Sequence, residues 1–167
     1  MKTKLFTWLF SAIALVGFAS CGDDDNDLPI NEVPVAYQNA LRAMYPEAVN
    51  VEWERNANFY VADFEKPGMD FDVWFGAEAT WAMTEIDYGN NLMLLPPAVS
   101  SAYSESQYAY TCVVDDVKSY EHTDKAFYII EVEPTNGGDD IYVYYNPDGT
   151  TLKVITQDVD ITPVTPI

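Results

Sequence analysis

Apolar residues recur at helical spacing in the segment that begins at Val33-Pro34. Pro34 suits the first turn of a helix, where a backbone N–H is not needed. Tyr45-Pro46 closes the pattern, because the residue before a proline avoids the helical region. We therefore predict a helix that ends near Met44. Its apolar positions, which fall on one helix face, are Val35, Ala36, Ala40, Leu41 and Met44.

A two-residue alternation of apolar and polar positions follows this helix and predicts β-strands. Val51 and Trp53, for example, alternate with polar neighbours. Turn-forming residues separate the segments, among them Asn56, Pro67-Gly68 and Gly76. The four predicted strands span residues 49–54, 58–65, 71–75 and 80–87.

The same order of patterns returns in the second half of the chain. Residues 95–99, Leu-Pro-Pro-Ala-Val, restart a helical pattern. Residues 59–64 align with 127–132, and residues 73–75 align with 143–145. We interpret this order as a tandem repeat, in which a helix followed by about four antiparallel strands occurs twice. The strands of the second copy are predicted at 109–119, 125–134, 140–146 and 150–157.

A helix followed by a meander predicts an α+β fold with the helices on one face of an antiparallel sheet. Two such units side by side could share one sheet of about eight strands and a continuous core, which helps small repeats to reach stability. The predicted organisation is a first unit at 33–90, a second and diverged unit at 91–158, and a C-terminal tail at 159–167.

The N-terminus matches an export signal. Lys2 and Lys4 precede an apolar run at 5–18 that is too short to span a membrane comfortably. The sequence before Cys21 resembles a bacterial lipobox, although Phe18 stands where leucine is common. We predict a lipoprotein signal peptide at 1–20, lipidation of Cys21 and anchoring to the outer membrane, on its periplasmic or its surface side. The alternative is an ordinary secretory signal with an incidental cysteine.

Acidic residues dominate the charge. The chain carries 27 acidic and 8 basic residues, a net charge of −19, and loss of residues 1–20 would remove two lysines and give −21. Such a charge excludes nucleic acid as a partner, because its binding requires lysine and arginine near phosphates. The acidic segment at 21–32 is expected to be a solvated tether, because like charges repel one another. Its acidic run directly after Cys21 also resembles the surface-export signals of some envelope lipoproteins.

Residues that could carry catalysis or bind metal are scarce. His122 is the single histidine, and its polar surroundings predict a solvent-facing turn rather than a catalytic site. Cys112 lies in a valine-rich run and is expected to be a small buried hydrophobic residue, with a reactive thiol as the alternative. Asp139-Asp140 and the run at 23–27 could bind calcium weakly but lack an EF-hand pattern. We therefore predict no catalytic residue, no metal site and no cofactor.

Aromatic residues offer a candidate binding surface. Strand alternation sends Tyr142 and Tyr144 to one face of the sheet and Val143 to the other, and it likewise separates Trp74 from its neighbours. If the face away from the helices is exposed, Trp74, Tyr142 and Tyr144 are the predicted contact residues, because tyrosine and tryptophan favour interfaces. The alternative is that these rings merely coat a half-buried sheet.

Several segments together resemble the PepSY-like family, which is also described as beta-lactamase-inhibitor-like. The resemblance is clear over 33–88 and weak over 95–157, where a Tyr-Pro-Glu-Ala match and a counterpart of Trp53 are missing. It implies a secreted protein with two tandem units, a binding or inhibitory role, and no catalytic residues to transfer. The segments are Val33-Pro34, Tyr45-Pro46-Glu47-Ala48, Val51-Glu52-Trp53, Tyr60-Val61-Ala62-Asp63-Phe64 and Val73-Trp74-Phe75.

These observations predict a non-enzymatic envelope lipoprotein that binds a protein or peptide through the sheet face away from the helices. Two alternatives stay open. The chain could be a glycan- or cation-binding accessory module, because aromatic strands can stack on sugars and carboxylates can hold calcium. It could also inhibit a secreted enzyme, although likeness of fold alone is a weak warrant for that.

Overall fold

The structure, a computed structural model, describes residues 27–166. The predicted signal peptide, Cys21 and most of the acidic tether lie outside the described residues. Within residues 27–166 no helix is both long and apolar enough to cross a membrane.

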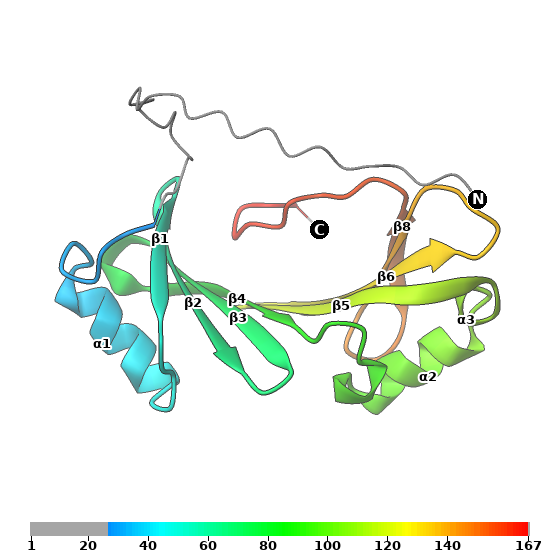
Figure 1. Cartoon of the computed structure of the whole chain (residues 1–167), viewed down its shortest axis with the longest axis horizontal. Helices are drawn as coiled ribbons and strands as arrows, with labels where there is room; N and C mark the ends of the chain where they lie inside the picture. The colour runs from blue at the N-terminus through cyan, green and yellow to red at the C-terminus, as the bar shows by residue number, and fades with distance from the viewer. Residues whose placement is uncertain (1–26, 167) are drawn as a thin grey trace, which may run out of the picture.

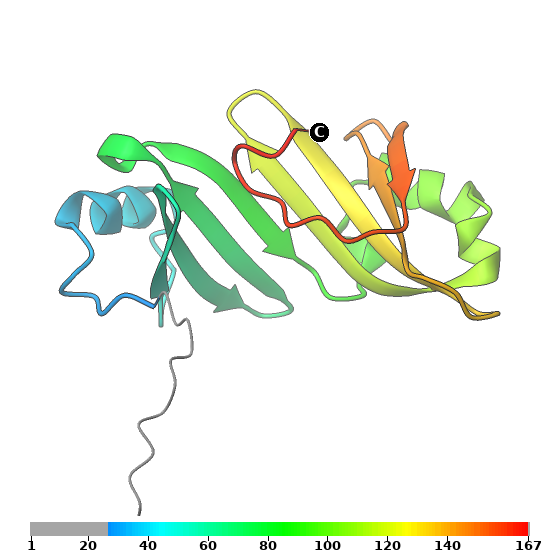
Figure 2. The same cartoon turned by 90° about the horizontal axis from the view of Figure 1, so that it is seen from above.

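Eight strands form one antiparallel sheet in which neighbours in sequence are neighbours in space, from β1 to β8 (Figures 1 and 2). The chain order is one helix and four strands, then two helices and four strands, with short 3-10 turns at η1 (Ala77–Ala79) and η2 (Leu92–Leu94). The α+β class is therefore as predicted. The other elements are α1 (Val35–Met44), β1 (Glu52–Asn56), β2 (Phe59–Lys66), β3 (Met69–Phe75), β4 (Trp81–Asp87), α2 (Pro97–Glu105), α3 (Tyr108–Thr111), β5 (Cys112–His122), β6 (Ala126–Pro134), β7 (Ile141–Tyr145) and β8 (Thr151–Ile155).

One local prediction was wrong. The strand expected from residue 109 starts only at Cys112, because residues 108–111 form α3. The Thr111 hydroxyl donates to the Gln107 carbonyl at 3.0 Å, and the Tyr110 N–H donates to the same carbonyl at 3.2 Å. These local bonds close a helical turn, and a pattern of only four residues is too short a signal to reveal it.

The helices α1 and α2 lie on the same side of the sheet, which we call the helix face (Figure 1). Leu41 of α1 is buried in a cluster with residues of β1, β2 and β3, and Val99 of α2 is buried in a second cluster with residues of β5, β6 and β7. Burial of alternate strand residues against amphipathic helices supplies most of the core. The two helix-face clusters therefore position both halves of the sheet.

The opposite side, which we call the outer face, is partly covered by the chain's own end. Residues 158–166, here the C-terminal segment, cross this side of the sheet, and the outer strands β1 and β8 stand up on either side of it (Figures 1 and 2). Ile161 is 3% exposed and belongs to an apolar cluster with side chains of β2 to β7. The C-terminal tail predicted at 159–167 thus includes a buried residue.

Gly149, in the turn between β7 and β8, joins the sheet to α2. Its φ is +84°, and a Cβ at this position would lie 2.5 Å from the carbonyl oxygen of Ala98. We expect Gly149→Ala to lower the free energy of unfolding by about 2–4 kcal/mol, because it adds a backbone clash to the penalty of a left-handed conformation. Urea denaturation followed by circular dichroism measures this.

Gly137→Ala is the matched control. Gly137 has a similar φ of +80°, but a Cβ there would meet nothing within 4 Å. This variant should lose only the conformational penalty, about 1–2 kcal/mol. Equal losses at both positions would contradict close packing of the β7–β8 turn on α2.

Candidate functional site

Carboxylates stand side by side across the outer face. The strand register places Glu52 of β1 opposite Asp63 of β2, Asp63 opposite Asp72 of β3, and Asp72 opposite Glu85 of β4. A second row follows one pleat further along the strands. We call these two sets the acidic rows; the second row contains Glu65, Asp70 and Asp87.

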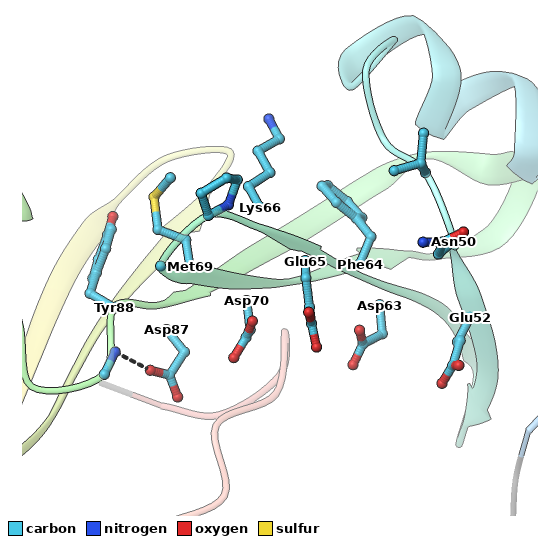
Figure 3. A pocket seen from close by; sticks show the side chains of 14 residues that line it. Asn50, Glu52, Asp63, Phe64, Glu65, Lys66, Met69, Asp70, Asp87 and Tyr88 are labelled. Atoms are coloured by element: carbon cyan, nitrogen blue, oxygen red, sulfur yellow. Dashed lines mark hydrogen bonds between the residues drawn. The ribbon is translucent and has the colours of Figure 1, made fainter.

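The acidic rows point to a common side of the sheet. Figure 3 shows Glu52, Asp63, Glu65, Asp70 and Asp87 directed to the outer face, whereas Phe64, Lys66, Met69 and Tyr88 lie on the other side. A hollow of about 1070 Å³ surrounds this end of the sheet and includes these side chains in its lining. Several of the acids are therefore accessible to a molecule that approaches the outer face.

This arrangement is electrostatically unfavourable for the isolated chain. Directly opposed residues on antiparallel strands have Cβ atoms about 5 Å apart, and like charges at this spacing repel. Burial first, and then the carboxylates of Glu85 and Asp63, raise the pKa of Asp72 to about 7. Burial and the nearby Glu52 likewise raise the pKa of Asp63. Clusters of raised carboxyl pKa values are typical of functional sites.

Lys118 of β5 partly neutralises the inner end of the acidic rows. Its Nζ lies 3.1 Å from Glu85 Oε1, 3.5 Å from Asp87 Oδ2 and 3.6 Å from Asp116 Oδ2. Despite its burial, these carboxylates raise the pKa of Lys118 and keep it charged. Asp63, Glu65 and Asp70 have no ion-pair partner within residues 27–166.

Along the strands, one pleat from the first acidic row, the outer face changes from acidic to aromatic. Side chains from β2 to β7 form one cluster there, in which Tyr120 and Phe127 stack with ring centroids 4.9 Å apart. We call this set the aromatic cluster; its buried members besides Ile161 are Val61, Trp74, Met83, Tyr120, Phe127, Ile129 and Tyr144.

The structure brings the three predicted contact residues onto the outer face. Trp74 and Tyr144 belong to the aromatic cluster and Tyr142 packs beside it, whereas Val143 belongs to a helix-face cluster. The predicted separation of faces is therefore correct. An exposed aromatic surface is not present, because Trp74 is 5% and Tyr144 1% exposed. Their role as contact residues stays a prediction.

Tyr142 and Tyr144 each contact a side chain of an adjacent strand. Lys153 Nζ lies 4.3 Å from the centroid of the Tyr144 ring, and the Tyr142 hydroxyl donates to Glu131 Oε1 at 2.8 Å. Both contacts arise between residues on the same face of adjacent strands. They could not be read from the sequence without the register.

His122 differs from its prediction. It ends β5 and is half-buried rather than solvent-facing, with its ring centroid 6.0 Å from that of Phe127. Burial lowers the pKa of His122. Cys112 is a free cysteine that packs against the α2 cluster but is only partly buried, so its predicted burial is met only in part. Within residues 27–166 no three His, Cys, Asp or Glu side chains are grouped in a way that could hold a metal ion.

The acidic rows were missed by the sequence reasoning, although a signal was present. Acidic residues occupy alternate positions in each of the first four strands, at Glu52 and Glu54, Asp63 and Glu65, Asp70 and Asp72, and Glu85 and Asp87. Alternation alone places each pair on one face. Only the register brings the pairs of different strands abreast.

Comparison with known proteins relates the chain to one family. The family model described as "Putative beta-lactamase-inhibitor-like, PepSY-like" matches residues 23–73 and 68–153. A search of curated proteins finds no match.

Three solved structures from Bacteroides are similar. A BLIP-like protein from Bacteroides fragilis shares 36% identity, with a TM-score of 0.66, over 77% of this chain and 91% of its own. A DUF2874 family protein from Bacteroides ovatus shares 32% identity, with a TM-score of 0.65, over 73% and 86%. A chain from Bacteroides eggerthii, described among "putative periplasmic proteins", shares 31% identity, with a TM-score of 0.65, over 73% and 87%.

The raised pKa of Asp72 predicts a pH-dependent stability. The carboxyl has a pKa of about 7 in the folded chain against an ordinary value of 3.8, so the folded state binds an extra proton between these limits. The contribution of Asp72 to the free energy of unfolding therefore falls as the pH rises from about 4 to about 7, and it stays low above pH 7. We expect Asp72→Asn to raise the free energy of unfolding by about 1–2 kcal/mol at pH 8, after allowance for solvent screening, and by little at pH 4.

Urea denaturation at pH 4 and pH 8 measures the difference. Glu47→Gln removes an exposed carboxylate remote from the acidic rows and is the control for loss of one charge. An Asp72→Asn variant that gains as much at pH 4 as at pH 8 would refute the repulsion argument.

Proposed function

Because the chain belongs to the PepSY-like, beta-lactamase-inhibitor-like family, we propose that it is a non-enzymatic envelope protein that binds a protein or peptide partner through the outer face of its sheet. The observation that carries this proposal is the pair of acidic rows. Opposed carboxylates lower the stability of the free chain, and such departures from good folding chemistry concentrate where a protein binds something else. A partner with basic side chains would relieve the repulsion.

The geometry of the face supports a macromolecular partner. The acidic rows extend over four adjacent strands, which lie about 5 Å apart, so they span a surface about 15 Å wide. This width suits a protein loop or an extended peptide. A net charge of −19 for the whole chain would further steer basic partners towards it.

The tandem interpretation of the sequence supports the same proposal. A helix and four strands precede a second helical segment and four strands in one sheet, as two fused units would produce. Fusion of two units would widen the outer face without the need for a second chain. We propose that the two halves are diverged copies, with the acidic rows specialised in the first.

A lipid anchor at Cys21 is the second part of the proposal. A neighbour described as a putative periplasmic protein supports an envelope location. Acyl chains on Cys21 would hold the domain at the outer membrane through apolar burial, about 0.8 kcal/mol for each methylene group.

Substitution of Cys21 tests the anchor. In Bacteroides cells that express the full chain, we expect Cys21→Ser to abolish labelling by radioactive palmitate and to move the protein from the membrane fraction to the soluble envelope fraction. Cys112→Ser, which keeps the proposed lipidation site, is the control. Continued labelling of the Cys21→Ser variant would refute lipidation at this residue.

Charge reversal on the outer face tests partner binding. A photo-crosslinking amino acid at exposed Asp63 would capture the partner in the cell envelope. In a separate double variant, Glu65→Lys with Asp70→Lys, two exposed carboxylates become lysines. This variant should bind the identified partner at least about tenfold more weakly than the wild type does, because its lysines would repel the basic side chains of the partner. Isothermal titration with the identified partner measures the change.

The matched control reverses two exposed carboxylates away from the outer face, Glu47→Lys after α1 and Glu105→Lys in α2. It changes the net charge by the same amount and should leave binding within about twofold at moderate salt, where distant charges are screened. Equal weakening by both double variants would reduce the effect to net charge and refute a site on the outer face.

The alternatives separate in simple assays. A glycan or a divalent ion that binds the native chain would raise its melting temperature in a thermal-shift screen. Inhibition of a secreted enzyme, such as a beta-lactamase, would appear directly in activity assays. The name of the Bacteroides fragilis relative, a BLIP-like protein, favours the inhibitor over the glycan-binding module as second candidate.

A further inference from the structure

The C-terminal segment occupies the aromatic half of the outer face through one side chain. Ile161 is buried in the aromatic cluster with Trp74 and Tyr144, whereas Val159 and Val164 of the same segment are exposed. A single aliphatic residue in a ring-lined pocket has the form of an anchor contact. The structure therefore contains a peptide segment bound to this face by its own chain.

Polar contacts of the C-terminal segment are internal. The Thr165 N–H donates to the Thr162 carbonyl at 2.9 Å, and the Thr162 N–H donates to Thr165 Oγ1 at 2.8 Å. Within residues 27–166 no hydrogen bond joins residues 158–166 to a strand. The segment is thus held by apolar burial of Ile161 rather than as an added strand.

Negative charge on both the C-terminal segment and the sheet opposes binding of the segment to the outer face. Asp158 and Asp160 of the C-terminal segment are exposed, Asp158 near Glu131 and Asp160 near Glu54 of the sheet. Burial first, then Asp27 and Asp63, and last Asp160, raise the pKa of Glu54. A cavity of about 80 Å³ lies between the segment and the sheet, and Asp158 lines it together with Asp116 and Glu131. Lys118 also lines this cavity, but its charge is already shared among Glu85, Asp87 and Asp116. The segment fits the pocket but not the charge around it.

The aromatic cluster also leaves a donor free. Trp74 Nε1 is buried and has no hydrogen-bond partner within the described residues. A buried N–H without a partner is less stable than one that donates a hydrogen bond. An acceptor on a different occupant, such as a backbone carbonyl, could satisfy it where Ile161 does not.

We propose that the pocket filled by Ile161, together with the adjoining acidic rows, is the docking site for a basic peptide segment that carries an aliphatic side chain, and that the C-terminal segment is its built-in competitor. This inference rests on the proposed function and specifies the partner's chemistry. A lysine or arginine beside the aliphatic anchor would meet the carboxylates that Asp158 and Asp160 repel.

Competition within the chain sets the expected affinities. A ligand binds only the fraction of molecules whose C-terminal segment is displaced, so its apparent dissociation constant is the intrinsic one divided by that fraction. Removal of the anchor should therefore strengthen binding of an external peptide. Better docking of the segment should weaken it.

The test uses the full chain without its signal peptide and a fluorescein-labelled peptide of residues 157–166 in which lysine replaces Asp158 and Asp160. Fluorescence anisotropy measures binding. We expect Ile161→Ser to bind this peptide at least about tenfold more tightly than the wild type does, since the anchor is worth more than 1.4 kcal/mol when buried. A peptide of native sequence should bind more weakly than the lysine peptide.

Two further variants act in defined directions. Val164→Ser, which changes an exposed residue of the same segment, should bind the lysine peptide as the wild type does. Asp158→Lys with Asp160→Lys should seat the C-terminal segment more firmly, weaken peptide binding several-fold and slow amide exchange at 158–166. This variant changes exposed residues only, so it decides the question if Ile161→Ser fails to fold.

Equal binding of the lysine peptide by the wild type, Ile161→Ser and the double lysine variant would overturn the proposal. So would equal binding of the two peptides. Failure of the proposed function has a different signature. In that case the peptide results hold, but Glu65→Lys with Asp70→Lys leaves the captured envelope partner bound as before.

Discussion

The two-residue period of a β-strand is the constraint on which this structure depends. It divides every strand of the continuous ladder from β1 to β8 between two faces. The helices can cover only one of them. Apolar residues at alternate positions, such as Val73 and Val143, fill the helix face, and the positions between them must form a second surface with its own chemistry. Any binding function of the sheet therefore depends on the residues at those intervening positions.

The outer face has two parts with different chemistry. Its acidic part carries carboxylates abreast, of which Asp63, Glu65 and Asp70 are exposed, and the fold tolerates them because the helix-face clusters and Lys118 provide stability nearby. Its other part is aromatic and would be a large apolar patch in water, a feature that monomeric proteins avoid. The chain covers it with its own C-terminal segment, through Ile161. The boundary between the acidic and the aromatic part crosses β2, β3 and β4 one pleat from the first acidic row, where Val61, Trp74 and Met83 follow the carboxylates.

The acidic and the aromatic parts of the outer face adjoin, so they affect the same bound segment. An occupant of the aromatic half lies beside the carboxylates, so its charge matters as much as its apolar side chain. The C-terminal segment satisfies the apolar requirement and violates the electrostatic one, because Asp160 lies among the carboxylates that surround Glu54. A weakly matched occupant protects the surface in the free protein and can give way to a better one.

Local sequence determined the elements and the faces. The helix before Tyr45-Pro46, the strands, the turn at residues 146–149, and the separation of Tyr142 and Tyr144 from Val143 all follow from dihedral preferences and from periods of 3.6 and 2.0, which neighbouring residues set. Register and long-range packing do not follow from neighbours. The tertiary structure alone aligned Asp63, Asp72 and Glu85 across three strands and returned Ile161 over Trp74, because these contacts join residues far apart in the chain and their energies depend on burial that exists only once the sheet has formed.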